Sequence, residues 1–178
     1  MASFALLRVA PLISATSYVT FFFAEDTFIR PLVHTATSPS ESQLRRHANR
    51  ILPGLYAFTR RGLPFVFITY PISIATAVTN IVQSDSGVTF ARDGAPQARA
   101  AAVFYLAGLI FSTLHLLFGP AAMAHLDHLG ADKGLDSDPR ADNTASIVAW
   151  LKINTIRGLV ADIPSWICYL AAFLSATS

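Results

Sequence analysis

The chain has 178 residues, of which 53% are apolar and only 13% are charged. Soluble domains usually carry about 25% charged residues, and the mean hydropathy here is +0.47. These values exclude a disordered chain, a coiled coil and an ordinary soluble domain. The net charge of +2 does not indicate a surface that binds nucleic acid. The single cysteine, Cys168, excludes a disulfide bond within the chain.

Four stretches are long and apolar enough to cross about 30 Å of hydrocarbon, which takes about 20 helical residues. They cover residues 4–24, 63–82, 100–117 and 147–172. A helix satisfies its own backbone hydrogen bonds, which lipid cannot do. The sequence therefore predicts an all-α, polytopic membrane protein with a bundle of four transmembrane helices, and we expect residues 1–178 to form a single membrane domain.

The first stretch contains Arg8 inside its apolar run, with no basic cluster before it and no clear cleavage site after it. We therefore expect a retained span rather than a cleaved signal peptide. Arg8 is expected either to reach the near interface or to pair with Asp162, because both residues lie toward the side that carries the termini.

The loops between the stretches differ in basic residues. The loop over residues 25–62 contains six arginines, the loop over 83–99 contains two, and the loop over 123–146 contains two basic residues among five aspartates. The positive-inside rule places the first and third loops in the cytosol and both termini across the membrane.

The first loop also carries a helical pattern over residues 41–60. Ser40 and Gln43 have the spacing of a capping box, and apolar residues recur at helical spacing around three arginines. This pattern predicts an amphipathic, basic interfacial helix, which either anchors the topology or binds anionic headgroups.

Polar residues at membrane depth are the first candidates for function, because a central charge costs about 2.5 to 3.5 kcal/mol on the insertion scale. In the fourth stretch, Asn154 and Arg157 share one helix face with Trp150. Asp162 is turned from Arg157 by about 140° in a straight helix, unless Pro164 bends the helix or starts a new one. We interpret Asn154, Arg157 and Asp162 either as a polar cluster facing the bundle interior or as structural contacts between helices.

The third stretch contains His115, which is either a general base or a packing residue. His125 and His128 follow with a spacing that two metal ligands share, but an ordinary loop-facing pair is the preferred interpretation, and no metal site is predicted. No Gly-rich nucleotide loop, nucleophile elbow or zinc-protease motif is present. Hydroxyls for a cavity or for the headgroup region are offered by Tyr18, Tyr70 and Tyr105.

With four spans, a histidine in the third, and a Trp-x3-Asn-x2-Arg pattern in the fourth, the chain resembles the anthrone-oxygenase-like family of small fungal integral membrane proteins. The matching residues are His115, Trp150, Asn154 and Arg157. The segments RVAPLISATSYVTFFFAED and DIPSWICYL also resemble a fungal subgroup found among secondary-metabolite pathway proteins.

The resemblance implies a membrane-embedded oxidoreductase that oxygenates a polyketide or related lipophilic intermediate without a cofactor, with molecular oxygen as co-substrate. A base removes an acidic proton, and the resulting carbanion reacts with O2 in a dry pocket. His115 would be the base, Arg157 the oxyanion partner and Asn154 an orienting group. The N-terminal span and basic first loop depart from the better-known anthrone oxygenases, so the reaction is open to another oxidation such as epoxidation.

The resemblance also implies a location in the endoplasmic reticulum or another endomembrane. The expected partners are the lipid bilayer, a lipophilic small-molecule substrate and enzymes of the same pathway, with no nucleic acid. The alternative function is a noncatalytic membrane adaptor or assembly protein. A transporter is weaker, because four spans are few and no inverted repeat is visible.

Overall fold

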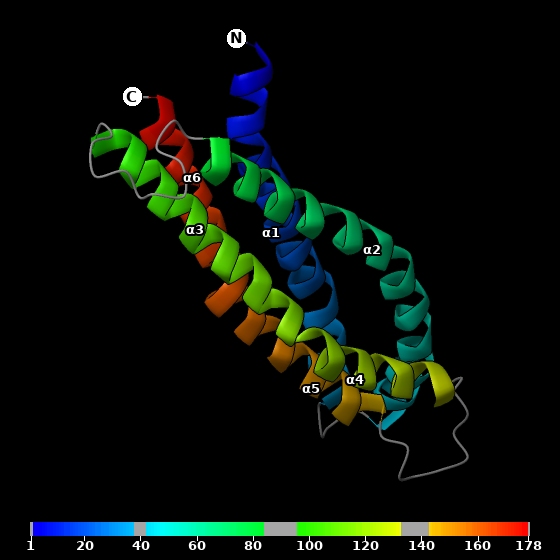
Figure 1. The fold of residues 1–178 in the computed structure, drawn as a ribbon. Coiled ribbons are helices and arrows are strands. Elements are labelled where there is room, and N and C mark those ends of the chain that lie inside the picture. Colours follow the sequence, from blue (N-terminus) through cyan, green and yellow to red (C-terminus); the bar gives the residue numbers. More distant parts are fainter. Residues whose placement is uncertain (1, 38–41, 84–95, 133–142, 178) are drawn as a thin grey trace. The chain divides into compact units, whose positions relative to one another are not determined.

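The computed structural model describes residues 2–37, 42–83, 96–132 and 143–177, and in these ranges it contains helices and no strand. The helices are α1 (Ala2–Thr37), α2 (Ser42–Gln83), α3 (Pro96–Leu117), α4 (Gly119–Asp132), α5 (Asn143–Arg157) and α6 (Ile163–Thr177), and one π-helical turn, η1 (Gly158–Asp162), joins α5 to α6 (Figure 1). The predicted all-α fold is confirmed.

Four helical stretches are long and apolar enough to cross a membrane. They run over Ala5–His34, Gly54–Val82, Pro96–Ala131 and Asn143–Thr177, with 30, 29, 36 and 35 residues. At 1.5 Å per residue even the shortest is about 44 Å long, so each exceeds the hydrocarbon thickness. Helix α1 continues well past the predicted end at residue 24 and α2 begins well before residue 63, whereas α3 ends at Leu117 as predicted.

The predicted first loop is largely helical. α1 continues through Glu25 to Thr37, and α2 begins at Ser42 and runs without interruption into the second apolar stretch. Residue 41 and the side chains of residues 42–50 lie outside the described part, so the amphipathic face predicted for residues 41–60 stays a prediction. The basic residues predicted for the second and third loops lie largely outside it too, and the predicted sidedness stays a prediction.

The chain divides into two compact units. Unit 1 comprises Met1–Thr20, Phe65–Leu117 and Gly158–Ser178, and unit 2 comprises Phe21–Pro64 and Phe118–Arg157. Each long helical stretch gives one part to each unit, so each unit holds segments of four stretches. The single membrane domain expected from the sequence stays a prediction.

Unit 1 packs small residues against tyrosines. In it α3 and α6 lie side by side (Figure 1). Gly108 on α3 permits this approach, because a Cβ there would meet Tyr169 Cε1 at 2.5 Å. The two terminal helical segments also meet in this unit, where Arg8 donates to the backbone oxygen of Ala176 at 2.9 Å. The buried core contains Ala15, Tyr18, Tyr70, Ala77, Ala101, Tyr105, Tyr169 and Ala172.

Unit 2 has a more aliphatic core, and its helices α4 and α5 pack together. Gly130 on α4 lies against Tyr56, where a Cβ would come within 2.7 Å of Cε1. The buried core residues are Ile29, Val33, Leu52, Ala122, Leu126, Leu129, Ile147, Trp150 and Leu151. Polar and charged side chains are buried beside these two cores as well, and some of them make up the candidate site.

Candidate functional site

A histidine–carboxylate pair lies in the interior of unit 1. His115 Nδ1 on α3 lies 2.8 Å from Asp162 Oδ1 at the end of η1. His115 is 6% exposed and Asp162 is 1% exposed. A carboxylate oxygen accepts hydrogen bonds, so this contact places a hydrogen on Nδ1.

Tyr70 on α2 completes this cluster. Its hydroxyl donates to the same Asp162 oxygen at 2.9 Å, and its ring stacks on the His115 imidazole with 3.7 Å between centroids. Tyr18 on α1 stacks in turn on Tyr70, with 4.2 Å between the two ring centroids. The imidazole is therefore held from its edge by a hydrogen bond and from its face by an aromatic stack.

A second group of hydroxyls fills the neighbouring part of the same core. Ser165 Oγ lies 2.6 Å from the Tyr18 hydroxyl and 2.7 Å from Ser112 Oγ, and Ser165 also donates to the Gly108 carbonyl at 3.2 Å. Ser112 Oγ lies 3.1 Å from the Tyr169 hydroxyl. These contacts satisfy buried hydroxyls and fix the packing of α1, α3 and α6 around the histidine.

The π-helical turn sets the direction of Asp162. Pro164 has no N–H for the carbonyl of Val160, and its ring crowds that carbonyl in a regular α-helix. The wider turn of η1, over Gly158–Asp162, gives the proline ring more room than a regular helix does. The predicted effect of Pro164 on this segment is present as a π turn followed by a new helix.

Arg157 and Asn154 form a separate cluster in unit 2. Arg157 Nη2 donates to Asn154 Oδ1 and lies 3.6 Å from Glu25 Oε2 on α1. Asn154 is 1% exposed and Glu25 is 4% exposed. The Nδ2 of Asn154 is buried and has no hydrogen-bond partner among the described residues. The cluster thus combines a neutralised cation with one unused amide donor.

The structure differs from the polar cluster of Asn154, Arg157 and Asp162 that the sequence predicts. Asn154 and Arg157 contact each other as expected from their shared face, but Asp162 belongs to unit 1 and pairs with His115 instead. The alternative pairing of Arg8 with Asp162 is wrong, because the Arg8 guanidinium donates to Ala176 and the Asp162 carboxylate is bound by two other side chains. The roles predicted for His115, Asn154 and Arg157 stay predictions.

Sequence reasoning missed Glu25 and the serines Ser112 and Ser165. Glu25 was assigned to a loop because it follows an apolar run, and its helical position seven residues after Tyr18 was the available signal. The two serines are not part of any recognisable sequence motif. Their only signal in the sequence is that they are small polar residues within apolar helical stretches.

The His-x-x-His pair lies on α4 and not in a loop. His125 is half-buried, whereas His128 and Asp127 between them are exposed. Within the described ranges, no group of three or more His, Cys, Asp and Glu side chains is placed to hold a metal ion.

The fold and the buried cluster define a class: a small all-α protein with four helices able to cross a membrane and a histidine–aspartate pair inside one unit. The chain is 30% identical over 175 residues to epoxidase gkaX of Penicillium citrinum, a match that covers 98% of this chain and 96% of that protein. It is 33% identical over 175 residues to epoxidase pydX of an Acremonium species, covering 96% and 94%. It is 30% identical over 174 residues to probable epoxidase scpX of Mollisia scopiformis, covering 96% of each. The chain belongs to this family of fungal proteins.

No protein-family model and no solved structure match the chain. The fungal relatives are named for an oxidation, which confirms the expected kind of family at that coarse level. None of these three carries the name anthrone oxygenase, so that finer resemblance stays a prediction.

Proposed function

We propose that the protein is a membrane-embedded oxygenase, of the epoxidase or anthrone-oxygenase type, that oxidises a polyketide or related lipophilic intermediate of fungal secondary metabolism. The observation that carries the proposal is the buried His115–Asp162 pair at 2.8 Å. An ionisable pair in an apolar interior is costly, and such pairs are concentrated at functional sites. The names of the relatives support an oxidation.

In the proposed mechanism His115 is the base. Asp162 accepts the Nδ1 hydrogen and orients the ring, so that Nε2 takes a proton from an acidic C–H of the substrate. The carboxylate then stabilises the imidazolium that forms. Tyr70 fixes the carboxylate by its hydrogen bond and the imidazole by stacking.

The carbanion left by this step reacts with O2 to give a peroxide anion, which takes up a proton and becomes the hydroperoxide. Loss of water from the hydroperoxide converts CH2 and O2 into C=O and H2O, and this balance needs no reductant. Epoxidation balances as well if the hydroperoxide transfers one oxygen atom to a C=C bond of the substrate and keeps the other as an alcohol. A cofactor-independent reaction is therefore proposed, with O2 as the co-substrate.

The roles expected for Arg157 as oxyanion partner and for Asn154 as orienting group remain part of the proposal, and within unit 2 these two side chains form a cluster of their own. The buried, unused Nδ2 of Asn154 supports a role as hydrogen-bond donor. Glu25 beside Arg157 lowers the cost of keeping that cation in an apolar segment. An endomembrane location and contact with other enzymes of the pathway belong to the same proposal.

The test is complementation of a deletion strain of the producing organism, followed by metabolite profiling. The His115→Ala variant is expected to insert normally and to accumulate the same unoxidised intermediate as the deletion. The His128→Ala variant is the matched control, because it removes an exposed histidine on α4. Full product formation by His115→Ala would reject the proposed site and favour the adaptor function.

A further inference from the structure

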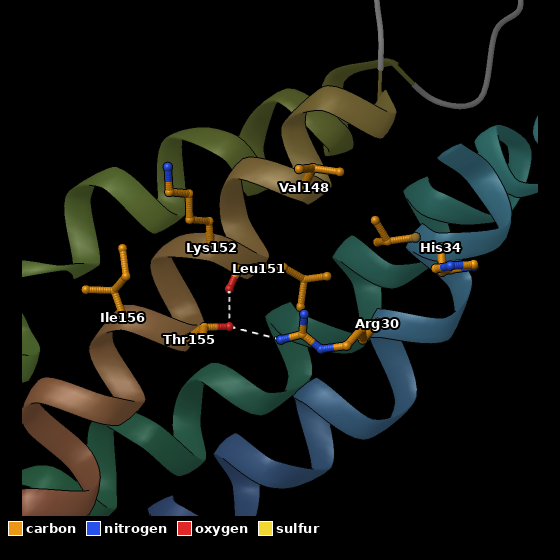
Figure 2. Close-up of a pocket in the computed structure, with 8 residues that line it drawn as sticks. Arg30, His34, Val148, Leu151, Lys152, Thr155 and Ile156 are labelled. Carbon is orange, nitrogen blue, oxygen red and sulfur yellow. Dashed lines mark hydrogen bonds between the residues drawn. The ribbon is translucent and has the colours of Figure 1, made fainter. Parts of the chain in front are cut away.

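Unit 2 contains a pocket of about 460 Å³ between α1 and α5. Figure 2 shows that Arg30 and His34 come from α1, whereas Lys152 and Thr155 come from α5. The pocket belongs neither to the His115–Asp162 pair nor to the Arg157 cluster. Its lining residues are Arg30, Val33, His34, Val148, Leu151, Lys152, Thr155 and Ile156.

Arg30 is fixed across the gap between the two helices. Its Nε donates to Asp26 Oδ2 at 3.0 Å, and its Nη2 donates both to Asp26 Oδ1 and to Thr155 Oγ1, the latter at 3.1 Å. Thr155 in turn donates to the Leu151 carbonyl at 2.9 Å (Figure 2). The guanidinium is thereby preorganised at the pocket, while 55% of its side chain stays exposed.

The lining combines basic groups with apolar walls. Among the described residues that line the pocket, Arg30, His34 and Lys152 are basic and none is acidic. Val148 and Ile156 continue the apolar wall to the surface, where they are 42% and 43% exposed. A ligand with one anionic group and an attached hydrocarbon chain matches this combination.

The position along α1 favours a lipid over a water-soluble anion. The apolar stretch of α1 ends at His34, so Arg30 lies one turn inside the end of a segment able to cross a membrane. Basic pockets between membrane helices at this depth bind anionic headgroups. Inorganic phosphate would leave the apolar walls uncovered.

We propose that this pocket binds an anionic phospholipid, with the phosphate on the Arg30 guanidinium. Asp26 offsets part of the Arg30 charge, so Lys152 supplies much of the net positive charge at the rim, and His34 adds a donor. The acyl chains lie along Val148 and Ile156. The bound lipid would bridge α1 and α5, which the Arg30–Thr155 hydrogen bond and apolar packing already join.

The test uses the full chain purified in detergent, with lipid retention measured by native mass spectrometry. Phosphatidic acid and phosphatidylcholine of identical acyl chains are titrated separately. Wild-type protein is expected to retain phosphatidic acid preferentially. The Arg30→Gln variant is expected to bind it about fivefold more weakly, equivalent to about 1 kcal/mol for one basic residue.

Two further variants test whether weaker binding by Arg30→Gln is caused by the loss of a positive charge at the pocket. Arg30→Lys keeps the charge and is expected to bind within about twofold of wild type, because a point charge still attracts phosphate. Arg60→Gln removes an exposed arginine of the same unit that is not part of the pocket lining and is expected to leave binding unchanged.

Three results would overturn the proposal. The first is equal retention of the two lipids by the wild-type protein. This comparison does not depend on the folding of any variant. The second is an equal loss of binding in Arg30→Gln and Arg60→Gln, which would indicate general surface charge. The third is displacement of phosphatidic acid by equimolar inorganic phosphate, which would indicate a site for free phosphate.

Discussion

Among single residues, Asp162 shows how a carboxylate is kept inside an apolar protein. It receives two hydrogen bonds on one oxygen, from Tyr70 and from His115. Hydrogen bonds to charged groups are worth about 1.5 to 3 kcal/mol each, which offsets much of the cost of burial. The same contacts orient the histidine, so stability and proposed chemistry depend on the same atoms.

Replacing Asp162 by asparagine tests the proposed role of the carboxylate charge in the reaction. The amide keeps the size of the side chain but removes the charge that orients and stabilises the imidazolium. We expect product formation to fall by about a hundredfold or more, as general-base catalysis is lost. The measurement is product yield per unit of membrane-inserted protein, and yield within about threefold of wild type would contradict the role of Asp162.

Replacing Tyr70 by phenylalanine is expected to have a smaller effect. The stack on His115 is retained, and the hydrogen bond from the hydroxyl to Asp162 is lost. This loss corresponds to about 1 kcal/mol, or less than about a tenfold decrease in product yield. A larger decrease than in Asp162→Asn, measured in the same strain, would show that Tyr70 acts in its own right.

Gly108 tests the packing of unit 1. A methyl group there would overlap the Tyr169 ring, whereas a methyl group at Gly54 meets nothing within 4 Å. We expect Gly108→Ala to destabilise the protein by about 1 to 3 kcal/mol and Gly54→Ala to be neutral or stabilising. Thermal unfolding in detergent measures both, and equal midpoints for the two variants would contradict the packing described.

Among the helical elements, the π turn η1 determines where the fourth apolar stretch presents its carboxylate. Without it, Asp162 would be turned about 140° from Arg157 on a regular helix. With it, Asp162 contacts His115 on α3. Pro164 lies two residues after this turn, in the first residues of α6.

The Pro164→Ala variant tests the role of the π turn η1. Alanine restores the N–H for the Val160 carbonyl and favours a regular α-helix, which turns Asp162 away from His115. We expect product yield to fall by about tenfold or more while the protein remains inserted and folded. Pro31→Ala on α1 is the control for a proline in another helix, and unchanged yield in Pro164→Ala would contradict the role of the turn.

The helices also show what the sequence was able to predict. Hydropathy located all four stretches that are able to cross a membrane, because apolar runs of about 20 residues are rare elsewhere. It ended α1 too early, because Glu25, Asp26 and Arg30 look like loop residues. In the structure Asp26 pairs with Arg30 one turn later and Glu25 lies beside Arg157, so these charges are tolerated within a helix.

The sequence singled out several buried polar residues and one of their contacts, Asn154 with Arg157, but not the pairing of Asp162 with His115. His115, Asn154, Arg157 and Asp162 stood out because polar groups are rare in such segments. The contact of Asp162 with His115 depends on the packing of two helical segments against each other, and a single sequence contains no direct record of it. Glu25 lies beside Arg157, and Tyr70 contacts Asp162, only in the folded chain.

For the whole molecule, four apolar helices and a basic first loop predict a fixed orientation in the bilayer. The first and last helical segments both belong to unit 1, where Arg8 and Ala176 are hydrogen-bonded. An even number of spans places both ends on one side. Reporter tags at the N-terminus and the C-terminus of the carbonate-resistant protein are expected to show the same protease accessibility. Opposite accessibility would contradict a four-span topology.

Oxygen incorporation by isolated membranes is the decisive measurement for the proposed function. Membranes containing the wild-type protein or His115→Ala are supplied with the intermediate that accumulates in the deletion strain, under ¹⁸O2. We expect ¹⁸O-labelled product with the wild-type protein and almost none with His115→Ala at equal protein level. Product that lacks the label, or equal labelled product from both membranes, would contradict an oxygenase that uses His115 as its base.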